Sequence, residues 1–442
     1  MKKLFAIILF SVALWHAGKA AVTNDLWVSL NRSPILAVAP NGTLLAFEEH
    51  RFSDWDSGRH DIVLKRSADN GQTWTPEQTV ATDGANCFSD ATVTVDSSNG
   101  KIFLITGWNL YGDTESSIND GTSVDTRHIV LVSSTDSGTN WSSPVDITAS
   151  VKSPGWRWYA SGPGRGIQLS TGRLLVPCYH TGASWDYYPN AIYSDDHGTT
   201  WNVGGGVTSP VNYDECAFVE LTNGAVMMNV RNDRGEGRRG IGISSDAGAT
   251  WSSVTNDATL LDPGCEGSFY RYTQPPGYYK SRLLFSNPAD TSSRQNLTIR
   301  LSYDDGATWA VSKTYCSTLA GYSSVVVLTN GNWAVLFENG TSTYFDKTTF
   351  ISDTLANLTG GADSLDPQTN PPPVLNITSS GSNVLLSWAV SAPSFLLQQN
   401  PDLSPTNWST FDGVGGIQVT NGQNFLWLLP TNAARYFRLK SP

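Results

Sequence analysis

Five copies of an eight-residue pattern, S-x-D-x-G-x-x-W, constrain the fold of this chain more than any other feature of its sequence. They begin at Ser67, Ser134, Ser194, Ser244 and Ser302, so that successive copies are 50 to 67 residues apart. In each copy the aspartate can accept hydrogen bonds from backbone amides, the glycine permits a positive φ and the tryptophan supplies apolar surface. One four-stranded sheet per repeat fits this spacing, which predicts a β-propeller.

A second repeat gives the number of blades. Strand-like runs flank six glycine turns, at Asn41-Gly42, Asn99-Gly100, Thr171-Gly172, Asn223-Gly224, Pro276-Gly277 and Asn330-Gly331. The eight-residue pattern is that of the Asp-box, and six turns with five boxes predict six blades, the last without a box. We therefore expect an all-β protein whose residues 21–358 form a six-bladed β-propeller.

The order of these signals also predicts where the functional site lies. Each unit consists of a strand, a glycine turn, a second strand, a loop, a third strand, an Asp-box and a fourth strand. Because neighbouring strands are antiparallel, the turns and the boxes share one rim of the propeller. The starts of the first strands and the ends of the second strands form the opposite rim, where we expect the chemistry.

Three segments lie outside the predicted propeller. Residues 1–20 combine two early lysines, an apolar run and a small-residue end, which predicts a secretory signal peptide and an exported, periplasmic or secreted protein. The apolar run is too short to span a membrane, so no membrane insertion is expected. Residues 359–373 have the composition of a linker, and residues 374–442 predict a small β-sandwich, fibronectin-III-like or carbohydrate-binding.

Charge and cysteine content narrow the possible partners. The formal net charge is −11 over 442 residues, and without the three lysines of residues 1–20 it is −14, from 25 basic and 39 acidic residues. A field of this sign argues against nucleic acid as a partner. The five cysteines have no metal-like spacing, so no metal site is predicted; their number is odd, so at least one is free or intermolecular, and the sequence does not specify any disulfide pair.

Arginines, acids and a tyrosine fall on the rim opposite the Asp-boxes. Arg32 precedes the first strand of blade one, Arg231 ends the second strand of blade four, and Arg294 lies in the corresponding loop of blade five. Since a guanidinium group binds a carboxylate through paired N–H donors, this trio predicts a site for a carboxylate ligand. The same rim carries further candidates for chemistry, which are Asp56, Glu215, Tyr322 and Glu338.

Short motifs surround these residues. They are Arg32-Ser33-Pro34, Arg51 five residues before Asp56, Asp214 to Leu221 with Asn229-Val230-Arg231, Ser286 to Thr298 around Arg294, Gly321-Tyr322-Ser323 and Leu336-Phe337-Glu338. Together they resemble the motifs of the exo-α-sialidases, which are retaining glycoside hydrolases, over residues 26–353. The sequence departs from that pattern at Ser33, Ala217 and Ser324, which affects substrate preference and rate but removes no catalytic group.

The resemblance implies a reaction and a role for each residue. Terminal sialic acids would be hydrolysed from glycoproteins, glycolipids or oligosaccharides with retention, through Tyr322 as nucleophile, Glu215 as its base and Asp56 as acid. It implies substrate binding by Arg32, Arg51, Arg231, Arg294 and Glu338, without a cofactor or a metal ion. Two alternatives remain: an enzyme of the same fold that transfers sialic acid or releases it by intramolecular attack, and a non-catalytic glycan-binding propeller.

Overall fold

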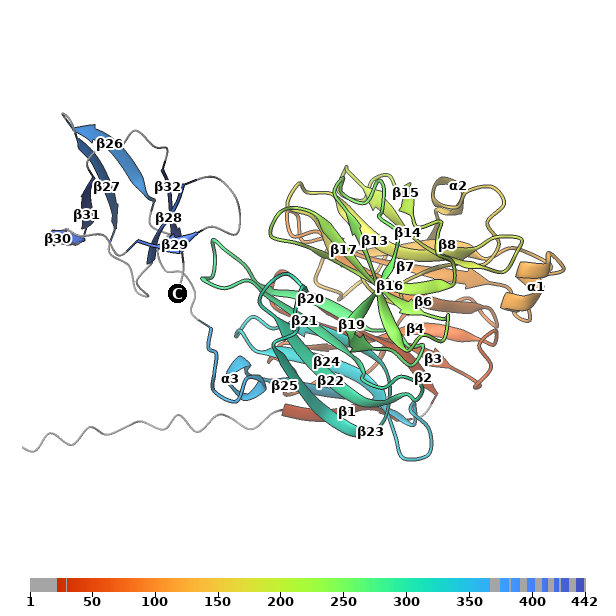
Figure 1. Ribbon diagram of the computed structural model, residues 1–442. Helices are drawn as coiled ribbons and strands as arrows, with labels where there is room; N and C mark the ends of the chain where they lie inside the picture. Colours follow the sequence, from red (N-terminus) through yellow and green to blue (C-terminus); the bar gives the residue numbers. More distant parts are fainter. Residues whose placement is uncertain are drawn as a thin grey trace, which may run out of the picture.

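The computed structural model consists almost entirely of β-sheet and is arranged as a propeller followed by a small sandwich (Figure 1). It describes residues 22–28, 30–365, 374–380, 383–389, 396–401, 408–411, 417–420, 423–428 and 435–440. The predicted signal peptide lies outside these residues. No helix in the described ranges is long and apolar enough to cross a membrane.

The first three blades each have four antiparallel strand positions, and in blade three β10 and β12 share the innermost position. Blade one contains β2 (Asn31–Val38), β3 (Leu44–Arg51), β4 (His60–Ser67) and β5 (Gln78–Ala81). Blade two contains β6 (Cys87–Val95), β7 (Ile102–Asn109), β8 (His128–Ser134) and β9 (Val145–Asp146). Blade three contains β10 (Tyr159–Ser161), β12 (Ile167–Gln168), β13 (Leu174–Thr181), β14 (Tyr187–Ser194) and β15 (Asn202–Gly206).

The remaining blades follow the same order. Blade four contains β16 (Tyr213–Glu220), β17 (Val226–Asn232), β18 (Arg238–Ser244) and β19 (Thr255–Leu261). Blade five contains β20 (Ser268–Thr273), β21 (Arg282–Pro288), β22 (Gln295–Ser302) and the first half of β23 (Val311–Val327). The second half of β23 begins blade six, with β24 (Trp333–Asn339) and β25 (Lys347–Asp353). Short elements between them are α1 (Glu115–Asp120), α2 (Thr148–Val151), β11 (Gly164–Arg165) and α3 (Leu355–Leu358).

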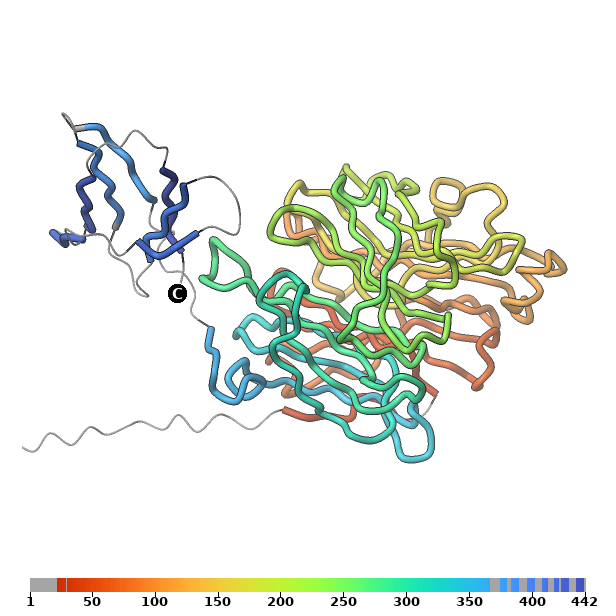
Figure 2. The backbone as a smooth tube through the Cα atoms, viewed as in Figure 1, coloured from red at the N-terminus to blue at the C-terminus, as the bar shows by residue number. Residues whose placement is uncertain are grey.

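The propeller is closed by its first strand, which the sequence did not indicate. Strand β1 (Val22–Val28) pairs antiparallel with β25 and becomes the fourth strand of blade six; in Figure 2 it is the red segment at the start of the coloured tube. Blade six therefore completes its sheet with a strand from the other end of the propeller. This pairing holds the two ends of the ring in one hydrogen-bonded ladder.

The predicted linker begins later than its composition indicated. Residues 359–365 follow α3 and pack on blade five, where Asp363 is 6% exposed. Both its carboxylate oxygens accept hydrogen bonds from Arg282, at 2.8 Å from Nε and from Nη2. A buried ion pair with two parallel bonds fixes this segment, so the packed part of the propeller extends at least to Asp363.

The Asp-boxes form compact turns on one rim, together with the glycine turns. In box four the Asp246 carboxylate accepts from Thr250 N (2.8 Å) and Thr250 Oγ1 (2.6 Å), and Ser244 Oγ accepts from Gly248 N (2.8 Å). The turns of adjacent blades reach the boxes, as between Thr222 N and Asp305 Oδ2 (2.9 Å). The structure thus places boxes and turns together, as antiparallel order requires.

Box tryptophans pack between blades. Trp74 meets Phe350 of blade six edge-on at 5.2 Å, and Trp141 meets Phe47 of blade one at 5.7 Å. These two boxes therefore join their own blade to the preceding one, because the indole packs against an aromatic ring of that blade.

Substitution Asp246→Ala is expected to lower the melting temperature by roughly 2 °C, because one capping side chain is lost. The box lies on the rim opposite the candidate site, so kcat/KM should stay within about twofold of the wild-type value. Thermal unfolding and steady-state kinetics on the same preparation test this. A large change of KM with unaltered melting would contradict the assignment of two separate rims.

The C-terminal unit is a two-sheet sandwich in its described residues. One sheet has the order β26 (Asn376–Ser380), β27 (Asn383–Ala389), β31 (Gln423–Leu428), β30 (Gln418–Thr420), and the other the order β29 (Ser409–Thr410), β28 (Leu396–Asn400), β32 (Tyr436–Lys440). Leu386, Trp388 and Leu426 of the first sheet form a buried cluster with Leu397 of the second. The sandwich therefore has a core of its own.

Candidate active site

The functional rim is built from bulges in the innermost strands. The antiparallel register shifts between Arg32 and Ile35 in blade one, between Ser89 and Thr92 in blade two, between Tyr213 and Cys216 in blade four and between Ala320 and Ser323 in blade six. Ser33 and Asp90 have φ angles of 60° and 54°, which are uncommon for residues other than glycine. A bulge redirects side chains, and each of these delivers a polar side chain to the same channel mouth.

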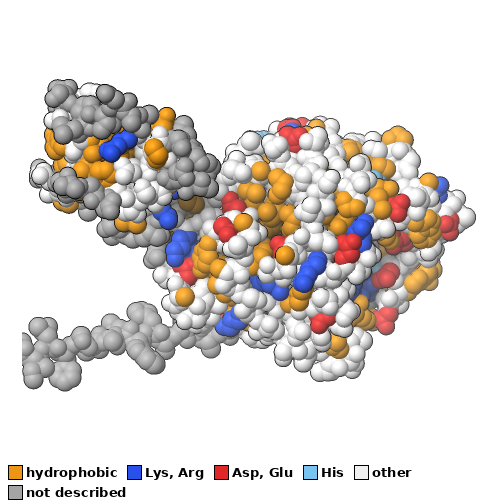
Figure 3. All heavy atoms as spheres, viewed as in Figure 1, with side chains coloured by type: hydrophobic (Ala, Val, Ile, Leu, Met, Phe, Trp, Pro, Cys, Tyr) orange, Lys and Arg blue, Asp and Glu red, His pale blue; other side chains and the backbone are white. Residues whose placement is uncertain are grey.

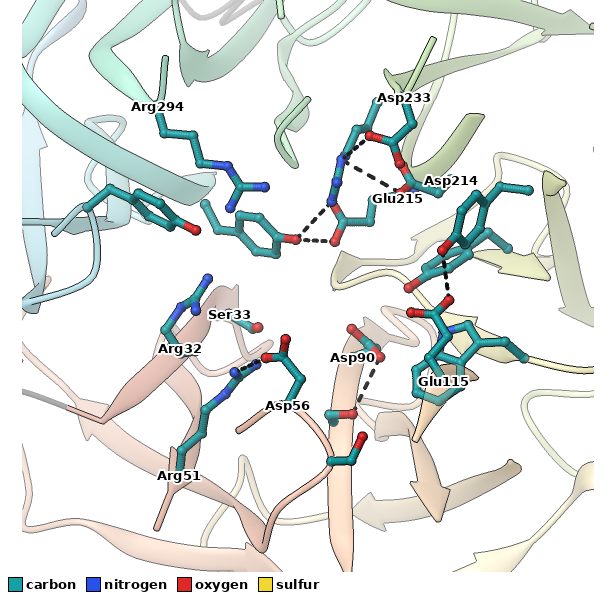
Figure 4. A pocket seen from close by; sticks show the side chains of 18 residues that line it. Arg32, Ser33, Arg51, Asp56, Asp90, Glu115, Asp214, Glu215, Asp233 and Arg294 are labelled. Atoms are coloured by element: carbon teal, nitrogen blue, oxygen red, sulfur yellow. Dashed lines mark hydrogen bonds and ion pairs between the residues drawn. The ribbon is translucent and has the colours of Figure 1, made fainter. Parts of the chain in front are cut away.

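A pocket of about 320 Å³ opens at this mouth and gathers the predicted residues (Figure 4). Seven of the eight line it: Arg32, Arg51, Asp56, Glu215, Arg231, Arg294 and Tyr322. The eighth, Glu338, is fully buried and contacts Arg32. In Figure 4, Arg32 and Arg294 enter from one side, and Asp90 and Glu115 lie on the other. The pocket therefore has a cationic half and an acidic half.

Glu338 holds two other site residues in place. Its carboxylate accepts from Arg32 Nε (2.6 Å) and Ser33 N (3.1 Å) through Oε1, and from Tyr322 N (3.1 Å) through Oε2. The pKa of the Arg32 guanidinium is raised, because the charge of Glu338 outweighs the effect of burial. Gly321 permits the approach, since a Cβ there would lie 2.2 Å from Glu338 Oε2. Glu338 thus links the first arginine to the tyrosine strand.

Tyr322, Glu215 and Arg231 form one hydrogen-bonded group. The Tyr322 hydroxyl donates to Glu215 Oε1, and Arg231 Nη1 donates to Glu215 Oε2 (2.9 Å) and to the Tyr322 oxygen (3.2 Å). Burial raises the pKa of Tyr322 well above its ordinary value, as does the charge of Glu215, while Arg231 and Arg294 oppose this. The phenol is therefore protonated at rest, with a carboxylate in position to take its proton.

Arg294 completes the cationic half without a carboxylate partner in the described residues. Its Nη2 donates to Gly264 O (2.9 Å), and its guanidinium carbon lies 5.3 Å from the Tyr322 ring centre and 4.8 Å from that of Tyr344. Arg32 also faces Tyr344, at 5.5 Å. The remaining donors of these arginines are available to an anion in the pocket.

Asp56 lies at the outer edge of the pocket. Its side chain is 84% exposed and is paired with Arg51 Nη1, while Arg51 Nη2 donates to the buried Glu49 at 2.7 Å. Glu49 Oε1 in turn accepts from Asp90 N (2.8 Å). Glu49 thus fixes the position of the Arg51 guanidinium group, and Arg51 in turn holds Asp56 toward the pocket.

The structure adds pocket residues that the sequence analysis did not select. Asp90 pairs with Arg127 at 2.6 Å, and burial raises the pKa of its carboxyl to about 7 although Arg127 opposes this. Glu115 at the start of α1 accepts from the Tyr187 hydroxyl (2.9 Å). The further lining residues are Ser33, Ser57, Ser89, Trp158, Tyr179, Asp214, Asp233 and Tyr344. Asp90 lies in the bulge of the first strand of blade two, as Glu215 and Tyr322 lie in the corresponding bulges of blades four and six. This shared position could have identified Asp90 from the sequence.

No group of three or more histidine, cysteine, aspartate or glutamate side chains in the described residues is arranged to hold a metal ion. All five cysteines are unpaired, and four of them, Cys87, Cys178, Cys216 and Cys265, are buried.

Comparisons with known proteins agree with the fold and the pocket. The sequence matches the BNR repeat-like domain over residues 42–335. It is 36% identical over 328 residues to a sialidase of Micromonospora viridifaciens, covering 70% of this chain and 50% of that protein. It is 33% identical over 352 residues to a sialidase of Paraclostridium sordellii, covering 72% and 84%. The solved structure of the Hadza microbial sialidase Hz136 superposes with a TM-score of 0.69 at 31% identity, over 74% of this chain and 66% of the other.

These findings place the chain in the class of BNR-repeat propellers, with arginines, acids and a tyrosine at one mouth of the channel. Within that class, the chain belongs to the sialidase family. It spans about half the length of the Micromonospora relative.

Proposed function

We propose that this protein is an exo-α-sialidase that hydrolyses terminal sialic acids from glycoconjugates with retention of configuration. One observation carries the proposal: three arginines surround a neutral phenol that donates a hydrogen bond to a carboxylate. A sialic acid bears a carboxylate on its anomeric carbon, so a site for it needs cations and a nucleophile without negative charge.

The arginines bind and orient the sugar. Arg32, Arg231 and Arg294 lie in one pocket and approach the space in front of Tyr322 from blades one, four and five. Their donors would fix the substrate carboxylate and place the anomeric carbon against the phenol oxygen. On the acidic side, Asp90 and Glu115 accept hydrogen bonds from N–H and O–H groups of the same sugar.

The covalent step uses the phenol and its base. As the Tyr322 oxygen bonds to the anomeric carbon, Glu215 takes the phenolic proton, and the bond from that carbon to the leaving oxygen breaks. Arg231 contacts both partners, so it stabilises the charge that passes from Glu215 to the phenol oxygen.

The exposed carboxyl assists departure and hydrolysis. Asp56 protonates the leaving oxygen and then removes a proton from water, whose oxygen attacks the anomeric carbon. The bond from that carbon to the Tyr322 oxygen breaks, and Glu215 returns its proton to the phenol oxygen. Its exposure suits this role, because the aglycone and the water both reach the pocket from solvent.

The test is hydrolysis of a fluorogenic sialoside, followed by proton NMR of the first-formed sugar. We expect free sialic acid that appears first as the α-anomer. An anhydro product would identify the intramolecular enzyme, and a sialylated acceptor would identify the transferase. No turnover by a folded protein that still binds sialosides would identify the glycan-binding propeller.

The organisation of residues 1–20, with its early lysines and apolar run, supports the further proposal that the enzyme acts outside the cytoplasm. Amino-terminal sequencing of the protein recovered from the periplasm or the medium tests this.

A further inference from the structure

A second cavity, of about 240 Å³, lies at the other end of the propeller channel from the candidate active site. Its walls come from the first strands of blades two to five, near the ends that lead into the glycine turns. Val95 and Glu220, for example, are the last residues of β6 and β16. The active site is lined by the opposite ends of such strands. The cavity is therefore the mouth of the channel on the Asp-box rim.

Arg165 lines this cavity as a partly buried cation. It lies on β11, which pairs in parallel with β6, and its guanidinium carbon is 4.2 Å from the centre of the Tyr270 ring. Its Nε is buried without a hydrogen-bond partner, and no aspartate or glutamate in the described part of the chain forms an ion pair with it. Burial lowers the pKa of Arg165, and Tyr270 opposes this.

A second arginine lines the same cavity with a free donor. Arg271 on β20 binds Asp305 (2.8 Å) and Ser281 (2.6 Å), but its Nε is also buried without a partner. Burial lowers its pKa too, even with Asp305 nearby.

The carboxylate in the lining, Glu220, opposes the lowering of the Arg271 pKa but has its hydrogen-bond partners elsewhere. Glu220 accepts from Ser170 N (2.8 Å) and Ser170 Oγ (2.6 Å), so its two oxygens are engaged away from the arginines. The cavity is therefore lined by two guanidinium groups: the charge of Arg271 is balanced by Asp305, whereas Arg165 has no ion-pair partner in the described residues. A partly buried cation without a counter-charge is less stable than a paired one, and an anion bound to Arg165 would supply the missing charge.

We infer that this cavity is a second anion-binding site, which takes a small oxyanion, a carboxylate or a sulfate group, on Arg165 and Arg271. The planar guanidinium fork matches the oxygens of such a group, and the Tyr270 ring already orients one of the forks. The site is formed by residues outside the active site and exists whether or not the protein hydrolyses sialosides.

Calorimetric titration tests the site, with the variant Arg294→Ala as background because the active site also binds anions. Sodium sulfate and N-acetylneuraminic acid are titrated separately in low-salt buffer, which distinguishes a free inorganic anion from the carboxylate of a sugar. We expect one saturable site for at least one of them, weakened at least tenfold by Arg165→Gln. The matched variant Arg234→Gln, an exposed arginine paired with Glu236, should bind as the background does. Binding of neither probe, or binding that Arg165→Gln leaves unchanged, overturns the inference.

Melting temperatures separate this role from a structural one. In anion-free buffer Arg165→Gln should melt no lower than the wild type, because it removes a partly buried charge that has no ion-pair partner in the described residues. The anion that binds in the titration should raise the melting temperature of the wild type and not that of the variant. If the variant melts lower in every buffer and the anion stabilises both proteins equally, Arg165 serves only to pack on Tyr270 and the inference fails.

Discussion

Replacing Tyr322 by phenylalanine is expected to lower kcat for a sialoside by at least roughly 10³-fold. The ring and its packing between Arg32 and Arg294 remain, but the phenol oxygen that is hydrogen-bonded to both Glu215 and Arg231 is lost. A 2,3-difluoro sialic acid, whose ring fluorine slows hydrolysis of the glycosyl-enzyme, should add one sugar to the peptide that contains Tyr322 of the wild type. Mass spectrometry of the digested protein measures the label.

The control is the neighbouring tyrosine. Tyr344 also lines the pocket and faces Arg32 and Arg294, so Tyr344→Phe should still take the label on Tyr322. Glu215→Gln should be labelled much more slowly, because the phenol then has no base. Label that appears on Glu215 or Asp56 of the wild type would mean that the nucleophile is wrongly assigned.

The repeat explains why much of the propeller and its site could be predicted from the sequence. A period in the chain fixes the strand order within each blade, and antiparallel order then fixes which rim each residue occupies. Arg32, Glu215 and Tyr322 are far apart in the sequence but occupy equivalent positions in their blades, which is why they meet. Their grouping follows from local signals repeated around a ring.

The features that were missed depend on contacts outside the repeat. The pairing of β1 with β25 joins the two ends of the propeller, and no local pattern in residues 22–28 specifies that partner. Tyr344 lies in a loop of blade six that is shaped by Asp346, whose carboxylate accepts from Thr341 N (2.8 Å) and Ser342 N (2.7 Å). Loops of this kind vary between blades, so the rim position of Tyr344 could not be inferred from the other blades.

The mixed surface charge bears on how an anionic substrate reaches the site. On the face that Figure 3 shows, basic and acidic side chains are interspersed, and the protein as a whole is negative. Attraction of a sialoside is therefore a property of the pocket and not of the general surface, because opposite charges close together largely cancel at a distance.

Because the attraction is local to the pocket, we expect a second large loss of activity when one of its arginines is replaced. Arg294→Ala should lower kcat/KM for a sialoside by roughly 100- to 1,000-fold, because a charge-assisted contact to a buried carboxylate is lost. Arg294 is the most informative of the three, since no acid in the described residues pairs with it, whereas Arg231 holds Glu215 and Arg32 holds Glu338. Its removal thus leaves the nucleophile and the base in place.

A control arginine and a control substrate isolate the contribution of Arg294 to binding of the substrate carboxylate. Arg234 lies on the same rim outside the pocket, paired with Glu236 at 2.9 Å, so Arg234→Ala should change kcat/KM by less than about twofold. A sialoside methyl ester has the same sugar without the negative charge, so it should be a poor substrate for the wild type and lose little further activity in Arg294→Ala. An equal loss on the acid and the ester would show that Arg294 supports the fold of the pocket and does not bind the carboxylate.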